Sequence, residues 1–526
     1  MKPQHIFEKI QVGPLMLHLK NEYDEGKKQM IFWIDLFSGA GGTTTGIHLA
    51  GLENVHVVAC VNHDHNALFS HWRNHPHCMH FVEDVRDFKV VQALKELTDR
   101  LRVDFPGCKI NLWASLECTN YSKAKGGLPR DGDSRTLAHA LFMYVKELDI
   151  DYIYIENVRE FMSWGPLDEK GRPISKLNGR DYLRWIKEMC SYGYQYDYQL
   201  INSADLGAYT SRERYFGQFA KTGLPIKWPE TTHSKKPDFG GLFGSKAKWK
   251  PVREVLDLED EGKSIFTRKK PLSDKTLERI YAGLVKFVAG GEDLFTIRYN
   301  GGDMKEKSKS VLNPLGSIAC SNRHGLIKSV FLSHYYGNGF NTSLDEPCPT
   351  LRTKDSAIKI ESKFVDQPWI MNTNFSNIGQ TLDQPLSVIT ANRKWHYLMN
   401  PSWFGNPSSI DLPSPVIIAR QDKSPMSKVS VSSGKIFAIP IFDRECEMMK
   451  KIKIFMAMYG IVDIKMRMLL IDELLKIQGF PKGYKLEGTQ TEQKKYIGNA
   501  VVPIVAKALV QSNTKAIERH YLKMAV

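Results

Sequence analysis

The sequence predicts an α/β fold with a doubly wound, mostly parallel sheet. Strand-like and helix-like segments alternate from about residue 28 to residue 220, which is the pattern of the βα units that build a parallel sheet. A glycine-rich turn joins the first strand to the helix that follows it, and glycine permits sharp turns and close approach of a ligand. From about residue 224 proline, glycine, serine and lysine become frequent, so a second domain is expected there.

Short apolar runs rich in β-branched and aromatic residues mark the strands of this sheet. Strands are expected at residues 31–35, 54–61, 110–114, 152–155 and 196–201, and helices at 43–50 and from 64 towards 72. Helical periodicity returns at Met466 and again over residues 503–521. Residues 1–27 are an N-terminal extension with at most a short helix.

Composition excludes several classes of protein. The chain has 526 residues, enough for two or three domains, and no apolar run approaches the roughly 20 residues that a membrane span needs. The N-terminus lacks the pattern of a signal peptide, so we expect no membrane partner and a cytoplasmic location. The eight cysteines include no CxxC pair, which argues against a disulfide framework or a zinc ribbon.

The net charge of +14 indicates a polyanionic partner. Residues 226–461 carry 34 Lys and Arg against 24 Asp and Glu, and therefore contribute +10 of that charge. A basic balance is informative only beside a site that requires a nucleic acid.

A candidate cofactor site follows the first strand. The stretch Asp35-Leu-Phe37-Ser-Gly39-Ala-Gly41-Gly42, called the glycine turn below, lies between a strand and a helix, where backbone and helix N-terminus can meet the polar groups of a ligand. No Lys-Ser or Lys-Thr follows the glycines, so it is not a phosphate loop. Asn62 ends the second strand, at the place where an acidic side chain usually binds a ribose, and Asp84 ends the third, where it could accept from an adenine amino group.

A candidate nucleophile follows the strand at residues 110–114. Cys118 opens a loop rich in glycine and lysine, and the carboxyl end of a strand is where open α/β sheets bind ligands. Lys123 and Lys125 would favour its thiolate, which is the nucleophilic form. A single cysteine is more often a buried apolar residue, so the assignment depends on the residues around it.

Six blocks in order resemble the DNA (cytosine-5)-methyltransferases. The glycine turn matches the family's DxFxGxGG turn for S-adenosylmethionine, and the later blocks match at Cys118 with Tyr121-Ser122, Glu156-Asn157-Val158, Arg212-Glu-Arg214, Gln478-Gly-Phe480-Pro481 and Gly498-Asn499-Ala500-Val501-Val-Pro503. The resemblance covers about 28–220 and 465–526. It implies a Rossmann-like S-adenosylmethionine-dependent methyltransferase sheet (28–225), an inserted mixed α/β target-recognition domain (226–461) and a C-terminal segment (462–526) that returns to the first.

The resemblance also implies the chemistry. The Cys118 thiolate would attack C6 of cytosine, Glu156 would bind or protonate N3, and Arg214 would hold O2 with support from Arg212. Asn499 and Val501 would pack against the cofactor. The base would have to leave the duplex, with the loop residues Ser122, Lys123, Lys125 and Arg130 contacting the DNA backbone.

These inferences make duplex DNA the expected substrate and a monomer the expected state, and they leave open a cognate restriction endonuclease as partner. The chain departs from the family pattern at Leu116 and Glu117, where prolines are expected, and at Thr119 and Thr210, where glutamines are expected. The Glu117 carboxylate would raise the pKa of the thiol. Two alternatives remain: a DNA-binding relative without catalysis, and an RNA cytosine-5 methyltransferase.

Histidines are concentrated between the second and third strands. His63, His65, His71, His75, His77, Cys78 and His80 fall within eighteen residues. Their spacing matches no standard zinc pattern, and several lie on one expected helix and the turn after it. We therefore assign no metal site from the sequence.

Overall fold

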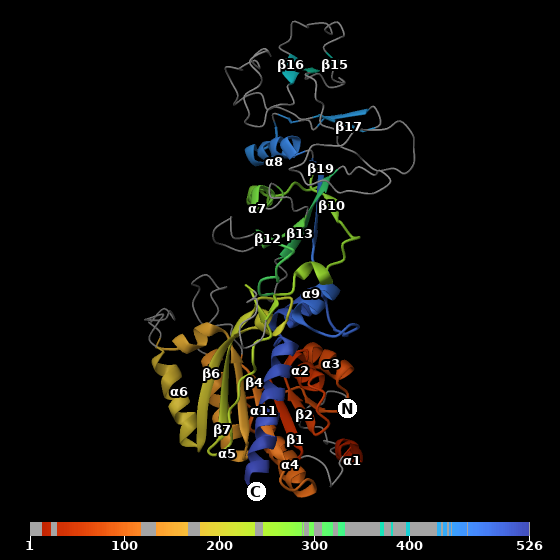
Figure 1. Cartoon of the computed structure of the whole chain (residues 1–526). Coiled ribbons are helices and arrows are strands. Elements are labelled where there is room, and N and C mark those ends of the chain that lie inside the picture. Colours follow the sequence, from red (N-terminus) through yellow and green to blue (C-terminus); the bar gives the residue numbers. More distant parts are fainter. Residues whose placement is uncertain are drawn as a thin grey trace. The chain divides into compact units, whose positions relative to one another are not determined.

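The structure is a computed structural model that divides into two compact units (Figure 1). Unit 1 comprises Met1–Asp257, Val311–Asn322 and Leu469–Val526, and unit 2 comprises Leu258–Ser310 and Arg323–Met468. The residues that the structure describes are 13–22, 29–116, 133–166, 179–236, 246–286, 288, 294–298, 308–318, 324–331, 369–372, 380–381, 396–399, 429–432, 435–438, 441–442, 444–459 and 461–524.

Unit 1 is built on a seven-stranded sheet with the order β3-β2-β1-β4-β5-β7-β6. Its strands are β1 (Ile31–Leu36), β2 (Val55–Val61), β3 (Met79–Phe81), β4 (Lys109–Ser115), β5 (Tyr152–Asn157), β6 (Tyr194–Asn202) and β7 (Glu213–Lys221). Strands β1 to β5 run parallel to one another, whereas β7 runs antiparallel to both β5 and β6. The strand order reverses between β1 and β4, which is where sheets of this kind bind ligands at their carboxyl edge.

Helices cover both faces of this sheet. In unit 1 they are α1 (Gly13–Glu22), α2 (Gly42–Leu49), α3 (His65–Asn74), α4 (Phe88–Asp104), α5 (Asp133–Glu147), α6 (Arg180–Ser191), α9 (Ile471–Gln478), α10 (Gln490–Asn499) and α11 (Pro503–Met524). Short 3-10 turns are η2 (Arg159–Ser163), η3 (Ser203–Leu206) and η4 (Val252–Val255), and β8 (His233–Ser234) pairs with β9 (Ala247–Lys248).

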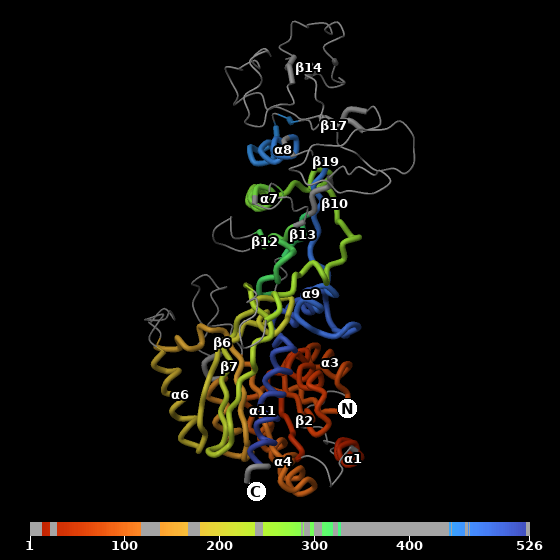
Figure 2. The backbone as a smooth tube through the Cα atoms, in the orientation of Figure 1, coloured from red at the N-terminus to blue at the C-terminus, as the bar shows by residue number. Residues whose placement is uncertain are grey.

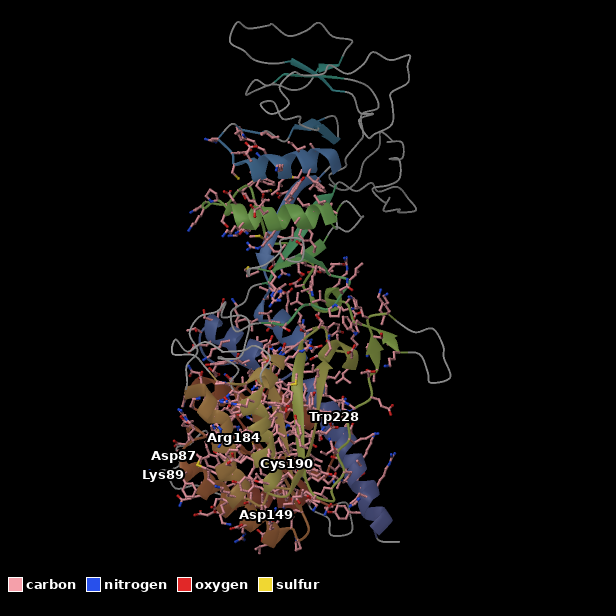
Figure 3. The ribbon with its side chains drawn as sticks, turned by 90° about the vertical axis from the view of Figure 1, so that its left-hand side faces the viewer. Asp87, Lys89, Asp149, Arg184, Cys190 and Trp228 are labelled. Carbon is pink, nitrogen blue, oxygen red and sulfur yellow. The ribbon has the colours of Figure 1, made fainter. Side chains whose placement is uncertain are left out.

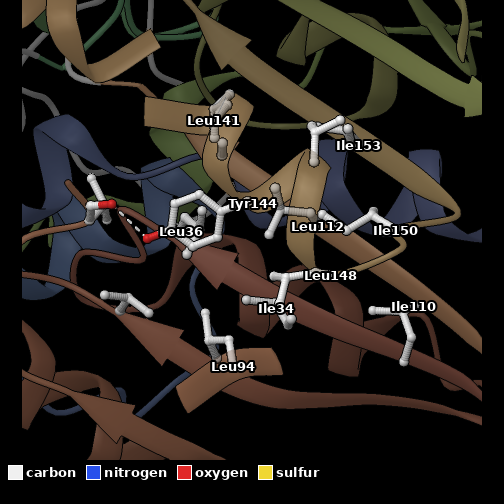
Figure 4. Packing of buried hydrophobic residues seen from close by; sticks show 14 of the residues in the cluster. Ile34, Leu36, Leu94, Ile110, Leu112, Leu141, Tyr144, Leu148, Ile150 and Ile153 are labelled. Carbon is white, nitrogen blue, oxygen red and sulfur yellow. Dashed lines mark hydrogen bonds between the residues drawn. The ribbon is translucent and has the colours of Figure 1, made fainter. Parts of the chain in front are cut away.

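Two apolar cores lie on opposite faces because the side chains of a strand alternate between them. Ile34 and Leu36 face the core shared with α4 and α5, whereas Ile31 and Trp33 face the core shared with α2 and α11. Figure 4 shows the first of these cores, in which the hydroxyl of Tyr144 donates a 2.6 Å hydrogen bond to the carbonyl of Val85. A strand buried on both faces reads as a continuous apolar run, and this is why the sequence revealed β1, β4 and β5.

The end of the chain returns to its beginning. Helix α11 lies beside α2, as the blue and red tubes of Figure 2 show. A Cβ on Gly46 would clash with the Pro503 carbonyl oxygen and the Ala506 side chain, so glycine is required for this close approach.

Unit 2 has its own core around an antiparallel five-stranded sheet with the order β10-β19-β13-β11-β12. The strands are β10 (Lys263–Ser264), β11 (Leu294–Arg298), β12 (Ser308–Ser310), β13 (His324–Phe331) and β19 (Ile461–Met468), with helices α7 (Asp274–Lys286) and α8 (Glu447–Tyr459) contributing to the same core. Separate small sheets contain β14 (Trp369–Asn372), β15 (Gln380–Thr381) and β16 (His396–Met399), and β17 (Val429–Ser432) with β18 (Lys435–Ala438).

The structure confirms the α/β class and every strand and helix expected between residues 31 and 201. The helical assignment at Met466 is wrong, because that residue lies in β19 and the next helix, α9, begins at Ile471. Unit 1 gives way to unit 2 after Asp257 and resumes after Met468, whereas the sequence predicts domain boundaries at 225/226 and 461/462. Within the described residues, no helix is both long and apolar enough to cross a membrane.

Candidate active site

The glycine turn leaves β1 with its backbone in unusual conformations. Phe37 has a φ of 58° and Gly39 a φ of 51°, both in the left-handed region, which costs a non-glycine residue about 1–3 kcal/mol and is concentrated at functional sites. Among the described residues, a Cβ on Gly39 would meet only the Phe37 carbonyl oxygen within 4 Å. This side of the turn therefore has room for a ligand to approach the backbone.

Gly41 and Gly42, the other two glycines of the turn, lie where neighbouring parts of the protein leave no room for a side chain. Gly41 is the N-cap of α2 with a φ of 102°, and a Cβ there would clash with the hydroxyl of Tyr484, which donates to the Ala40 carbonyl at 2.5 Å. A Cβ on Gly42 would clash with the carbonyl oxygen of Val501. The C-terminal segment thus holds the turn from behind.

Asp35 is fully buried beneath the turn. The hydroxyl of Thr44, in the first turn of α2, donates to its Oδ2 at 3.0 Å, and its Oδ1 has no hydrogen-bond partner among the described residues. Burial raises the pKa of Asp35 to about 8 because water no longer stabilises the charged carboxylate. Asp35 therefore supports the turn from inside.

Asn62 and Asp84 follow the neighbouring strands β2 and β3. The Oδ1 of Asn62 accepts from the backbone N–H of Asp64 at 2.8 Å. Both carboxylate oxygens of Asp84 accept from Arg86, at 2.7–3.2 Å, and these hydrogen bonds lower the pKa of Asp84. Since β3, β2 and β1 are adjacent and parallel, their carboxyl ends form one edge of the sheet. Together with the open side of Gly39, these residues fit an elongated nucleoside cofactor lying along that edge.

Glu156 lies at the carboxyl end of β5 and is 5 % exposed. It is in register with Ser115 of β4, three residues before Cys118. Two arginines lie near its Oε1, with Arg214 Nε at 3.5 Å and Arg212 Nη2 at 3.8 Å. Within the described part of the chain this oxygen has no hydrogen-bond partner. A buried acceptor of this kind fits a ligand that carries an N–H group.

Arg212 connects three segments of unit 1. It is 3 % exposed, and its Nη1 donates to the carbonyl oxygens of Gly498 at 3.0 Å and Ile318 at 3.4 Å. Next to Gly498, Asn499 is exposed at the end of α10 and Val501 is buried. Arg214 is partly exposed on β7 and donates to the Glu213 carbonyl at 2.8 Å.

Five of the proposed site residues lie outside the described residues, namely Cys118, Ser122, Lys123, Lys125 and Arg130. The structure brings Glu156, Arg212 and Arg214 into one cluster, and it sets Gly42 against Val501.

Three further residues support the site, and the sequence predicted no role for them. Gln478, fully buried at the end of α9, donates to the Ala500 carbonyl at 2.8 Å, and Tyr484 and Thr44 hold the glycine turn. Gln478 belongs to one of the six matching blocks, so the sequence did mark its position. The sequence does not mark Thr44 and Tyr484, because their hydroxyl groups bond to residues 9 and 444 positions away.

The family model for C-5 cytosine-specific DNA methylases matches residues 31–299 and 354–515 of this chain. The chain belongs to that family. The membership expected from the six blocks is therefore confirmed, and the matched ranges contain the glycine turn, Glu156, Arg212 and Arg214.

Among its relatives is the type II methyltransferase M.XorII of Xanthomonas oryzae pv. oryzae, which is 29 % identical over 214 residues, covering 38 % of this chain and 43 % of the relative. The type II methyltransferase M.AquIA of Picosynechococcus is 26 % identical over 233 residues, covering 43 % and 86 %. Thus the match spans less than half of the first relative and most of the second. A crystal structure of a Spodoptera frugiperda DNMT2 mutant aligns over 92 % of this chain and 99 % of its own, with 13 % identity and a TM-score of 0.45.

Proposed function

We propose that this protein transfers a methyl group from S-adenosylmethionine to C5 of a flipped-out cytosine in duplex DNA, through a covalent bond between Cys118 Sγ and C6 of the base. The observation that carries this proposal is Glu156, whose buried Oε1 lacks a hydrogen-bond partner in the described chain while two arginines flank it. Its strand neighbour Ser115 leads directly into the Cys118 loop.

Cytosine C5 is a poor nucleophile until a group adds at C6. The Cys118 thiolate would form the C6–S bond, and the Glu156 carboxyl group would donate a proton to N3 and so neutralise the charge developing in the ring. The N3–H formed in this step would remain hydrogen-bonded to Glu156, which takes the proton back when the C6–S bond breaks. S-adenosylmethionine, when bound, supplies the methyl group as an electrophilic sulfonium. Once C5 carries the methyl, a base removes the C5 proton, the C6–S bond breaks and the thiolate is restored.

The arginines hold Glu156 in position. Arg212 is buried and anchored to two carbonyl oxygens, so it has little freedom to rearrange. Arg214 is partly exposed and is the cation available to hold O2 of the base. The loop residues Ser122, Lys123, Lys125 and Arg130 complete the site by contacting DNA phosphates.

The cofactor would lie along the ends of β1, β2 and β3. Phe37 and Gly39 would contact it at the turn, Asn62 would bind the ribose and Asp84 the adenine amino group, with Asn499 and Val501 closing the far side. Asp35, Gly41 and Gly42 hold the turn in shape. The Arg86 pair leaves Asp84 charged, and a carboxylate retains further acceptor sites in that state.

Duplex DNA is the proposed substrate because the chain carries a net charge of +14 and a base must leave the stack before its C6 can be attacked. Residues 226–461 would recognise the target sequence. We further propose that the protein acts as a monomer in the cytoplasm, beside a restriction endonuclease of the same specificity, since relatives are named type II methyltransferases.

Covalent trapping on duplexes that contain 5-fluorocytosine tests the proposal, because fluorine at C5 blocks the last elimination. With S-adenosylmethionine present, we expect a denaturant-stable adduct for the wild type and for Cys190→Ala, a matched control on α6 (Figure 3), and none for Cys118→Ala. Glu156→Gln should bind DNA but form adduct roughly 10²–10⁴-fold more slowly, whereas Glu188→Gln, at an exposed position of α6, should form it at the wild-type rate.

Two results would overturn the proposal. Absence of an adduct, despite measurable binding of cofactor and DNA, would indicate a binding protein without catalysis. An adduct that forms on structured RNA in preference to duplex DNA would replace DNA by RNA as the substrate.

A further inference from the structure

Two thiols and two imidazoles converge inside unit 1, away from Glu156 and its arginines. They come from β2 and α3, both labelled in Figure 1, from the residue before β3 and from β3 itself. We call them the thiol–imidazole cluster, which comprises Cys60, His71, Cys78 and His80. Each is at most 2 % exposed, and one donor atom from each lies within 4.8 Å of those of the other three.

We propose that the thiol–imidazole cluster binds one Zn²⁺ ion in tetrahedral coordination. Zinc bonds of about 2.3 Å to sulfur and 2.0–2.1 Å to nitrogen place tetrahedral ligands about 3.8 Å apart for two sulfurs and about 3.5 Å for sulfur and nitrogen. The Sγ atoms of Cys60 and Cys78 are 3.6 Å apart, and Cys78 Sγ is 3.5 Å from His80 Nε2. The facing nitrogens of His71 and His80 are 2.8 Å apart, so these two rings would separate by about 0.5 Å on binding.

The hydrogen bonds around His71 leave one of its ring nitrogens with a lone pair that can bind a metal ion. Both Thr44 Oγ1, at 2.9 Å, and Cys60 Sγ, at 3.3 Å, lie beside His71 Nε2. Because Thr44 Oγ1 donates to Asp35 at 3.0 Å, its lone pairs are available to accept the N–H of His71 Nε2. His71 Nδ1 is then unprotonated, and it faces His80. A metal-binding histidine usually donates its other N–H to a fixed acceptor in this way.

Charge balance favours a divalent cation at this depth. Two thiolates and two neutral imidazoles with Zn²⁺ have no net charge. Without a cation the two buried thiols have weak sulfur hydrogen bonds to one another and to the imidazoles, besides the single contact between the two rings. Cys60 and Cys78 are free thiols in the structure. A site with two sulfur and two nitrogen ligands in tetrahedral geometry is typical of zinc rather than magnesium or calcium.

The spacing of these residues along the chain explains why the sequence did not predict the site. Cys60 and His80 are opposite each other on adjacent parallel strands, so they meet only once the sheet has formed. His63, His65 and His77, in the same histidine-rich stretch, are exposed and do not contribute.

The ion would stabilise the part of unit 1 that carries the glycine turn. A Cβ on Gly41 would touch the ring of His71, and Thr44 connects that ring to Asp35. The inference does not rest on the proposed methyl transfer, since a structural zinc would be present whatever the reaction.

Metal content of the full chain, purified without chelator and measured by plasma mass spectrometry, tests the inference. We expect one zinc per chain in the wild type and in two matched controls, His77→Ala and Cys190→Ser, and loss of the metal in Cys78→Ser and His80→Ala. Because a ligand variant can fail to fold, the wild type is also stripped of metal and titrated with Co²⁺. Tetrahedral sulfur ligation then gives intense visible bands and a thiolate charge-transfer band in the near ultraviolet.

Restoring zinc to the stripped wild type should raise its thermal unfolding midpoint again, because a ligand that binds only the folded state stabilises it. Zinc-free protein that also shows no tetrahedral cobalt spectrum would overturn the inference and leave a hydrogen-bonded cluster. A Cys60–Cys78 disulfide, detected as two lost thiols by mass spectrometry of protein kept under reducing conditions, would also overturn it.

Discussion

Arg212 offers the sharpest test of how unit 1 is assembled, and we predict that Arg212→Met destabilises it by about 3 kcal/mol. Removing one partner of a buried ion pair costs about 3–5 kcal/mol, and we take the lower end because Glu156 keeps Arg214 at 3.5 Å. The carbonyl oxygens of Gly498 and Ile318 would also lose a charged donor. Methionine fills part of the same volume, so lost packing contributes little.

Urea unfolding followed by hydrogen exchange measures this loss in unit 1 alone, through peptides from β5 and β7. If the free energy of unfolding falls by about 3 kcal/mol per molar urea, the urea concentration at which these peptides lose half of their exchange protection should fall by about 1 M. Arg184→Met, at an exposed position of α6 (Figure 3), serves as the control and should change stability by at most about 0.5 kcal/mol. If the two variants shift the midpoint equally, Arg212 does not connect the three segments.

Further predictions concern the glycine turn and the core. Gly42→Ala sets a Cβ against the Val501 carbonyl and should lower the thermal unfolding midpoint, at a cost of about 1–3 kcal/mol. Gly13→Ala, whose Cβ would have no described atom within 4 Å, should leave the midpoint unchanged, and equal midpoints for the two variants would exclude the close contact at Gly42. Since burial raises the pKa of Asp35 from 3.8 to about 8, the folded chain keeps a proton that the unfolded chain loses, so the free energy of unfolding should fall as pH rises through that interval. Urea titrations of Asp35→Asn should show a flatter pH profile, and parallel profiles would refute the burial argument. Tyr144→Phe removes the 2.6 Å hydrogen bond to the Val85 carbonyl and should lower the free energy of unfolding by about 1–2 kcal/mol in the same titration. An unchanged free energy would show that this hydrogen bond does not stabilise the fold.

The parallel core of unit 1 could be predicted from the sequence because its strands are short apolar runs. β1, β4 and β5 are buried along their whole central length, so local composition marks them. Met466 shows where this rule does not apply. β19 alternates apolar and charged residues in the run Ile-Val-Asp-Ile-Lys-Met-Arg-Met, and directly before α9 so short an alternation also fits the helical period.

The candidate site was only partly predictable, for a physical reason. Motif blocks identified Glu156, Arg212 and Val501 one at a time, but which of them touch is decided by strand order and by the return of α10 and α11 to the sheet. The thiol–imidazole cluster shows the same limit more clearly, since Cys60 acquires its neighbours only through the register of β2 and β3. Pattern reading finds residues that act within one segment, and long-range pairing assembles the rest.

The return of the C-terminal segment has a consequence for how the protein is made. Unit 1 needs Gly498 for Arg212 and Val501 for the glycine turn, yet both are synthesised after all of unit 2. Domains generally fold as units during synthesis, so on the ribosome unit 2 can complete its own sheet while the first 257 residues still lack α9, α10 and α11. We therefore expect the nascent first segment to expose the sheet face that α11 later covers, and to be the stage of synthesis most dependent on chaperones.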